Sequence, residues 1–149
     1  MPIGETGINK FIESPYHMVI QRKNQVLLSF LKIRAIVNGR EIYPLLNTKP
    51  VVIPVEKNHP KVVVTDGYHF TRPLKLVYKD MNIYCFKVSC GISDLQLLFG
   101  FIALMVFYVS GLYTGLLILK VASFIPLVYL LFYYYLNREQ FIRLIPVVD

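Results

Sequence analysis

The sequence predicts an all-β N-terminal domain, a β-sandwich, followed by a C-terminal hairpin of two transmembrane helices. Two observations predict this fold class: short β-rich runs separated by turn residues in the first part of the chain, and one long apolar block after them. We therefore divide the 149 residues into a leader or edge segment (1–15), a cytoplasmic β-sandwich-like domain (16–91), a transmembrane hairpin (92–137) and a short cytoplasmic tail (138–149).

The charged residues are concentrated before the apolar block. Residues 1–94 hold 13 of the 16 Lys and Arg residues and 7 of the 9 Asp and Glu residues, which gives this part a formal charge of +6. Between Asp94 and Asn137, Lys120 is the single charge in 42 residues.

A chain of this length has room for one ordinary domain and a small appendage, which excludes a large multidomain enzyme.

The β domain is predicted from short runs rich in β-branched and aromatic residues, each bounded by turn residues. The runs are 17–22, 26–37, 41–43, 51–55, 61–65, 74–78 and 83–88. Within the second run, Leu31, Ile33, Ala35 and Val37 share one face while Lys32 and Arg34 point the other way, as expected for a strand with one solvated face. Proline residues interrupt several runs and cannot donate to a strand ladder, so these strands should be short, broken or at sheet edges.

Two dipeptides predict tight turns between strands. Asn38-Gly39 supplies the two positive-φ positions of a type I′ turn, which makes residues 30–43 the clearest predicted hairpin. Asp66-Gly67 is the second such signal, between the run 62–64 and residues 68–70. Together these turns favour an antiparallel β fold over a helical bundle.

Residues 37–41 and 66–69 also carry a resemblance to a known class of domain. The pattern Val-Asn-Gly-Arg-Glu, followed some thirty residues later by Asp-Gly-Tyr-His, resembles small bacterial β-sandwich modules of the PEGA or carboxypeptidase-regulatory type. The resemblance covers residues 26–90, although the family usually has Pro-Gly before the aromatic-His pair. It implies a non-catalytic surface or assembly domain, often tethered to a membrane.

The apolar block is long enough for two membrane crossings. A helix needs about 20 apolar residues to span the hydrocarbon layer, and helices satisfy their own backbone in lipid. Ser110, Gly111 and Gly115 favour a turn near residues 110–115, with helices at about 92–110 and 113–136. The alternative turn runs from Lys120 to Pro126 and leaves the second helix short.

Charge asymmetry and tyrosines predict how the hairpin is oriented. Lys and Arg precede the first helix, and Arg138 and Arg143 follow the second, so both termini should be cytoplasmic. If the chain is bacterial, this places it in the inner membrane. Tyr133, Tyr134 and Tyr135 fit an aromatic belt at the same interface. The residues that follow could lie along the headgroups or pack back on the β domain.

Lys120, Gly111 and Gly115 are the candidate functional positions within the apolar block. An ionisable group in hydrocarbon is costly, so Lys120 either extends toward the headgroups or has a role in an ion pair or conduction. Gly111 and Gly115 form either the hairpin turn or, with the alternative turn, a helix-packing seam.

No catalytic, cofactor or metal motif is present, and we expect neither an enzyme nor a bound cofactor. His17, His59 and His69 are scattered and are expected to be ordinary surface or turn residues. Cys85 and Cys90 lack the paired spacing of a zinc site and are expected to be free thiols. Asp66 lies near His69, but no nucleophile motif accompanies the pair. No signal peptide is visible at the N-terminus.

Two functional hypotheses follow, each with the lipid bilayer as a partner. The first is an accessory or assembly subunit whose hairpin packs in a larger membrane complex or homo-oligomer. The second is a sensor or effector whose hairpins oligomerise in the bilayer, supported only by Lys120, Thr114 and Ser123. The basic side chains are explained by a solvated surface or by anionic lipid headgroups. We do not expect nucleic acid as a partner, because the cations are spread through the strands.

Overall fold

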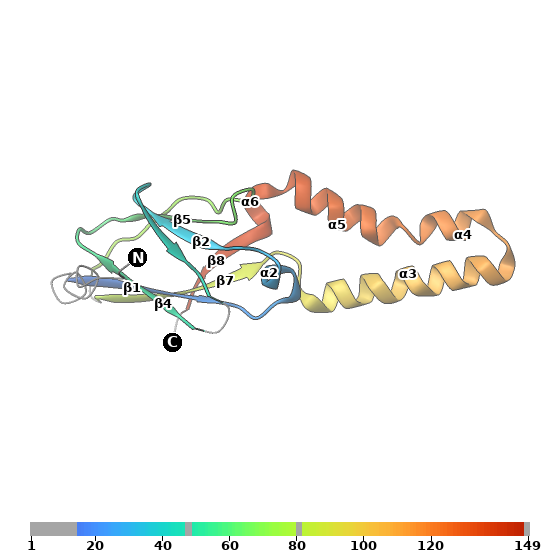
Figure 1. Ribbon diagram of the computed structural model, residues 1–149, viewed down its shortest axis with the longest axis horizontal. Helices are drawn as coiled ribbons and strands as arrows, with labels where there is room; N and C mark the ends of the chain where they lie inside the picture. The colour runs from blue at the N-terminus through green and yellow to red at the C-terminus, as the bar shows by residue number, and fades with distance from the viewer. Residues whose placement is uncertain (1–14, 47–48, 80–81, 148–149) are drawn as a thin grey trace, which may run out of the picture.

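The computed structural model describes residues 15–46, 49–79 and 82–147, so the predicted leader 1–15 lies almost wholly outside the described residues. A β domain of two four-stranded sheets carries a helical hairpin at one end (Figure 1). The strands are β1 (Tyr16–Arg22), β2 (Arg34–Val37), β3 (Glu41–Pro44), β4 (Val51–Val55), β5 (Lys61–Thr65), β6 (Leu74–Lys75), β7 (Ile83–Cys90) and β8 (Ile142–Pro146). The helices are α2 (Val26–Ser29), α3 (Asp94–Thr114), α4 (Leu117–Ala122), α5 (Ile125–Leu136) and α6 (Arg138–Phe141).

The first sheet combines strands from both ends of the described chain, in the order β4-β1-β7-β8. β1 pairs antiparallel with β4 and parallel with β7, so that Met18 lies opposite Tyr84. β7 pairs antiparallel with β8, with Ser89 opposite Arg143. A parallel pair needs a long connection, and here the whole second sheet lies between β1 and β7 in the chain.

The second sheet has the order β3-β2-β5-β6 and contains the predicted hairpin. Asn38 and Gly39 have φ values of 52° and 69°, which confirms the turn between β2 and β3. The Asp66-Gly67 signal does not give a two-residue hairpin. β5 ends at Thr65, and only an isolated bridge from Thr65 to Phe70 follows. The Asp66 carboxylate instead accepts hydrogen bonds from the Tyr68 and His69 backbone N–H groups.

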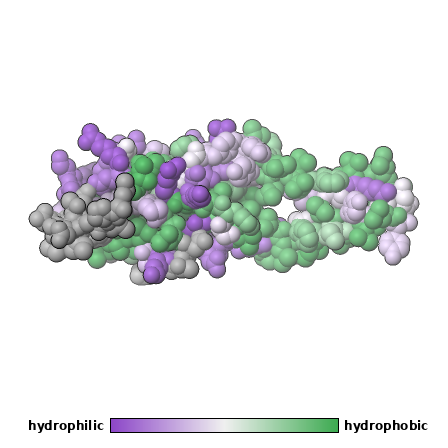
Figure 2. All heavy atoms as spheres, viewed as in Figure 1, coloured by the Kyte–Doolittle hydropathy of each residue, from purple (hydrophilic) through white to green (hydrophobic). Residues whose placement is uncertain are grey.

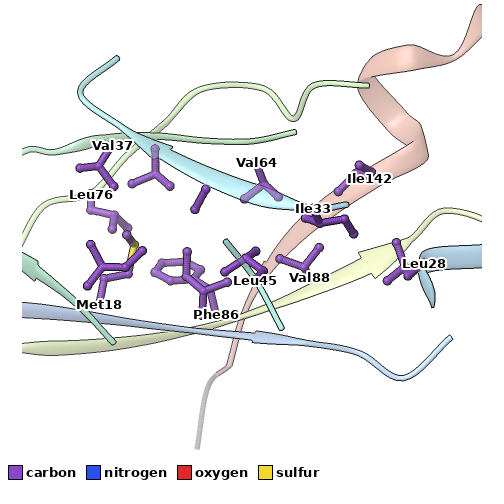
Figure 3. Packing of buried hydrophobic residues seen from close by; sticks show 14 of the residues in the cluster. Met18, Leu28, Ile33, Val37, Leu45, Val64, Leu76, Phe86, Val88 and Ile142 are labelled. Carbon is purple, nitrogen blue, oxygen red and sulfur yellow. The ribbon is translucent and has the colours of Figure 1, made fainter. Parts of the chain in front are cut away.

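The core lies between the two sheets (Figure 3). Ile33, Ala35 and Val37 are at most 3% exposed while Lys32 and Arg34 are exposed, so the predicted alternation is confirmed. From the first sheet, β1 and β7 contribute buried residues that include Met18, Ile20, Phe86 and Val88. The fold therefore agrees with a β domain followed by helices.

Three predicted strands differ from the structure by two residues or more, and two others, 17–22 and 41–43, differ by one. The run 26–37 begins with helix α2, because the Val26 N–H donates to the Asp94 side chain and the Ser29 hydroxyl donates to the Val26 carbonyl. The run 74–78 is a strand only over its first two residues. β7 extends two residues beyond the predicted run, to Cys90, because β8 provides a partner for its end.

The segment predicted as a short tail is part of the domain, so this boundary was wrong. Phe141 and Ile142 are 1% and 0% exposed and belong to the hydrophobic core. β8 then forms one edge of the first sheet (Figure 1). Of the two placements considered for residues after the hairpin, packing back on the β domain is therefore the one observed.

The hairpin turns at the glycine position. α3 ends at Thr114, and Gly115 follows with a φ of 68°, the left-handed conformation that favours glycine at a helix C-terminus. The first helix thus runs four residues further than the predicted end at 110. The alternative turn region is a break between α4 and α5, with Pro126 in the first turn of α5.

Both arms of the hairpin are long and apolar enough to cross a membrane. α3 has 21 residues, and α4 with α5 forms a second span of 20 residues, Leu117–Leu136. Only 6% of the apolar window in each span is buried. Figure 2 shows the hairpin as a largely hydrophobic surface beyond the more polar β domain. These helices are therefore not core helices of the β domain.

Candidate functional site

The candidate site is the junction where the second arm of the hairpin meets the β domain. We call it the junction cluster and define it as Asp66, Tyr68 and His69 from the loop after β5 together with Tyr133, Tyr134, Arg138 and Phe141 from α5 and α6. The two groups are more than sixty residues apart in the sequence. Their contacts fix the position of α5 relative to the second sheet.

Asp66 organises the loop that presents His69. Its Oδ1 accepts the backbone N–H groups of Tyr68 and His69 at 2.9 and 2.7 Å, and its Oδ2 lies 2.8 Å from Nδ1 of His69. The Asp66 side chain is 5% exposed. Burial opposes ionisation, but the hydrogen bonds from His69 and Tyr68 outweigh it, and the pKa of Asp66 is lowered. The carboxylate is therefore the favoured form.

His69 is fully buried, and each of its ring nitrogens faces an oxygen. Nδ1 lies against the Asp66 carboxylate, and Nε2 lies 2.8 Å from the main-chain carbonyl oxygen of Tyr134. A carbonyl oxygen only accepts hydrogen bonds, so Nε2 must carry a proton. Nδ1 faces a carboxylate oxygen of Asp66, so both ring nitrogens have an oxygen partner.

Aromatic rings enclose this polar pair. Phe141 stacks on the His69 ring with centroids 4.3 Å apart, and Tyr134 meets the same ring edge-on at 4.5 Å. Tyr68 stacks on Tyr134 at 5.8 Å. The Arg138 guanidinium lies 4.2 Å from the centre of the Tyr68 ring, a cation–π distance. The Asp66–His69 pair thus lies in a dry setting that strengthens its hydrogen bonds.

A second contact joins the end of α5 to α6 and β8, above Gly91, the residue after β7. The Tyr133 hydroxyl donates to the Gln140 carbonyl oxygen and accepts from Arg143, each at 3.3 Å. Gly91 lies beneath this contact, and a Cβ there would overlap the Tyr133 hydroxyl and lie 2.6 Å from the Gln140 oxygen. The Gly91 N–H donates to the Phe141 carbonyl at 2.8 Å. Glycine is therefore required by close packing at this position.

The first arm of the hairpin is attached separately. Ser93 caps α3 by accepting the Gln96 N–H, and the Gln96 side chain accepts the Ser93 N–H in return, a capping box. Asp94, the first residue of α3, accepts the Val26 N–H from α2 at 3.0 Å. Both arms are thus joined to the β domain by specific hydrogen bonds rather than by flexible linkers.

The Asp66–His69 pair has the residue types of a catalytic acid–base pair, but its imidazole ring is buried. His69 has 0% exposure, and both of its ring nitrogens have oxygen partners. A general base needs a free lone pair within reach of a substrate proton. In this arrangement the pair joins the loop to α5, and both His69 ring nitrogens are already engaged. Among the described residues, no group of three or more His, Cys, Asp or Glu lies close enough to hold a metal ion.

The other predicted positions in the apolar block lie at the far end of the hairpin. Gly111 is buried in α3 against α4, where a Cβ would lie 2.9 Å from Cγ and 3.0 Å from the backbone nitrogen of Lys120. Gly115 forms the turn and has open space around it. The Thr114 and Ser123 hydroxyls donate to carbonyls of their own arms, those of Ser110 and Lys120. These side chains do not form a polar face along the hairpin.

The comparisons with known proteins give no relative. No family model, curated protein or solved structure matches the chain. The resemblance of residues 26–90 to PEGA or carboxypeptidase-regulatory modules therefore stays a prediction.

The structure brings some of the predicted residues together and separates others. Tyr133, Tyr134 and Arg138 meet in the junction cluster, where the first two face the β domain, while Tyr135 is 56% exposed and remains suited to a belt. Lys120, Gly111 and Gly115 lie at the hairpin tip. The expectation that His69 is an ordinary surface or turn residue was wrong, because it is fully buried. Cys85 and Cys90 are free thiols, as predicted.

Proposed function

We propose that the chain is a non-catalytic, membrane-anchored accessory or assembly subunit of a larger membrane complex or homo-oligomer. In this proposal the hairpin crosses the bilayer and returns, and the β domain lies on the cytoplasmic side with both termini. If the chain is bacterial, the membrane is the inner one. The β-sandwich then acts as a docking domain held at the membrane surface.

The observation that carries the proposal is the exposure of the hairpin. Its two arms are 21 and 20 residues long, and only 6% of each apolar window is buried by the rest of the chain. A core helix of a soluble protein would be mostly buried, and a signal sequence would lie near the N-terminus. Large apolar side chains such as Phe99, Phe101 and Phe132 are more than half exposed. Lipid or partner helices must cover this surface.

A hollow between the arms favours packing against another helix. It has a volume of about 400 Å³ and lies where α3 and α5 diverge, beside Gly100, Phe101, Leu104, Pro126 and Leu130. Gly100 is the one small residue among the described residues of its lining, and a glycine in a membrane helix allows close approach of another helix. The ionisable side chain of the span, Lys120, is at the tip, and Thr114 and Ser123 are engaged locally. This arrangement favours assembly over a polar pathway.

The test is the partner state in native membranes. The chain should co-purify in mild detergent with a stable partner, or as a defined oligomer, identified by cross-linking and mass spectrometry. Gly100→Leu fills the hollow and should weaken the association, whereas Val109→Leu adds bulk outside it and should not. A lone monomer for the native chain would contradict the assembly role.

A further inference from the structure

A basic pocket opens on the β domain at the end from which the hairpin leaves. It has a volume of about 570 Å³. Its walls come from the end of β1, from α2 and the residues after it, from the end of β3 and from the loop after β5. The lining residues that matter here are Arg22, Lys32, Arg34, Leu46 and Asp66. The junction cluster shares only Asp66 with this pocket.

Arg22 is the unusual member of the pocket. The residue is 7% exposed, and its Nε and Nη2 atoms are buried without a hydrogen-bond partner in the described part of the chain. Burial lowers the pKa of this guanidinium, in agreement with its loss of solvent. Leaving a buried charged donor unpaired is costly, so such a group normally has an anionic or acceptor partner.

Asp66 does not serve as that partner. Both of its oxygens are already used by Tyr68 and His69, and the buried Arg22 Nε and Nη2 atoms have no partner among the described residues. Lys32 and Arg34 are exposed on the same pocket and add two further cations. The pocket thus has an excess of positive charge around a deeply placed guanidinium, which suits a phosphate group.

The position of the pocket indicates where the phosphate comes from. Ser29 of its wall ends α2, and α2 is hydrogen-bonded to Asp94, the first residue of the apolar arm α3. Beside the pocket, Phe30 is 80% exposed and Leu46 is 58% exposed. A cationic pocket next to exposed apolar side chains, at the level where a span begins, matches the headgroup and upper acyl chain of a phospholipid.

We propose that this pocket binds the phosphate of an anionic phospholipid, with Arg22 as the central donor, Lys32 and Arg34 at the rim, and Phe30 and Leu46 against the acyl chains. This assignment rests on the membrane anchoring proposed above. It adds a specific lipid contact at the surface to the non-specific contact of the hairpin with the bilayer. The lipid would orient the β domain over the leaflet.

The test is binding of defined lipids to the full chain in dodecyl maltoside, followed by native mass spectrometry. Phosphatidylglycerol should bind with a Kd about tenfold or more lower than phosphatidylcholine, and Arg22→Met should remove this preference, because charged hydrogen bonds contribute at least that factor. Lys87→Gln changes an exposed cation elsewhere on the β domain and should leave the preference within about twofold. Circular dichroism establishes that Arg22→Met is folded, and Lys32→Gln with Arg34→Gln provides a second variant that leaves the core intact.

The outcomes separate this proposal from the proposed function. Equal binding of the two lipids, or a preference unchanged in both basic-pocket variants, overturns the lipid site while leaving membrane anchoring intact. Inorganic phosphate that competes for the pocket at the same concentration as phosphatidylglycerol shows a free-phosphate site and overturns the lipid assignment. A chain that is monodisperse in buffer without detergent contradicts the anchoring itself, whatever the pocket binds.

Discussion

His69 connects two parts of the chain through acceptors of different kinds. One is a side-chain carboxylate three residues earlier, and the other is a main-chain carbonyl 65 residues later. The carbonyl belongs to Tyr134, near the end of α5, where helical carbonyls lack partners within the helix. The same residue therefore closes the Asp66 loop and caps the second arm.

Replacement of this ring should destabilise the protein strongly. His69→Ala removes a fully buried ring between Phe141 and Tyr134 and leaves Asp66 Oδ2 and the Tyr134 carbonyl unpaired. We expect a loss of about 2–4 kcal/mol in the free energy of unfolding at pH 7, measured by circular dichroism in mild detergent with urea. His59→Asn is the matched control, since Asn also tolerates the positive φ of that position and the loss should be small.

The loss of unfolding free energy caused by His69→Ala should become smaller at acid pH. The pKa of Asp66 is lowered in the folded protein, so its contribution is present above the ordinary Asp pKa of about 3.9 and is lost as the pH falls through the lower folded value. The difference between the native chain and His69→Ala should therefore shrink below about pH 4. A difference that is constant from pH 5 to pH 2 would mean that the ionised carboxylate does not contribute.

Gly91 is a second position where a single atom decides the packing. Gly91→Ala places a methyl group against the Tyr133 hydroxyl and the Gln140 carbonyl, so the end of α5 must move away from β7. Overpacking of this kind costs about 1–3 kcal/mol. Gly100→Ala is the control, because its Cβ would meet Pro126 at an ordinary 3.5 Å. The melting temperature, measured by circular dichroism, should fall clearly for Gly91→Ala and not for Gly100→Ala.

At the scale of elements, local chemistry in the sequence predicts some features well. Asn38-Gly39 determines its turn because the requirement for positive φ belongs to those two residues alone. Gly115 is recognisable for the same reason. Helix α2 cannot be predicted in this way, because the Val26 N–H donates to the side chain of Asp94, 68 residues away. Similarly, Nε2 of His69 bonds to a backbone carbonyl, which leaves no trace in the residue type of its partner.

β8 is absent from the predicted strands, although its sequence does contain a strand pattern. Ile142, Arg143 and Leu144 alternate as in a strand, with burial falling on Ile142 and partly on Leu144. A position directly after a predicted membrane span favours a tail instead. Its strand partner, β7, lies more than fifty residues earlier, and only that pairing makes a five-residue run stable.

Removal of β8 should therefore unfold the β domain. A stop codon after Phe141 removes the fully buried Ile142 and leaves the end of β7 as an open edge. We expect loss of cooperative unfolding and rapid digestion by trypsin in detergent. A stop codon after Val147 keeps the whole of β8, including the Val147 N–H bond to Cys85, and should behave like the native chain.

At the scale of the whole molecule, the hairpin leaves and rejoins the same end of the β domain (Figure 1). Capping by Ser93 and Gln96 fixes its first arm, and the junction cluster fixes its second. The two attachments therefore lie on one side of any membrane that the hairpin crosses. The tip at Tyr113 to Gly115 must lie on the other side, because each arm is long enough for a full crossing.

This topology is testable with the cysteines that the chain already has. Tyr113 is 90% exposed at the tip, and Cys85 is exposed on β7 of the β domain. Cys90 is buried, and burial raises the pKa of its thiol, so it reacts slowly with maleimides and does not interfere. Tyr113→Cys therefore gives one reporter on each side of the membrane.

In intact cells, a membrane-impermeant maleimide should label Tyr113→Cys and not Cys85, with peptide mass spectrometry distinguishing the two. Permeabilised cells should give labelling at both positions, because the β domain is then accessible from its own side. Cys85→Ser in the same background confirms which thiol reacts. Labelling of both positions in intact cells would place the β domain outside. Labelling of both only after permeabilisation would mean that the hairpin does not reach the far side, since a crossing is the only way for the exposed tip to react while Cys85 is protected.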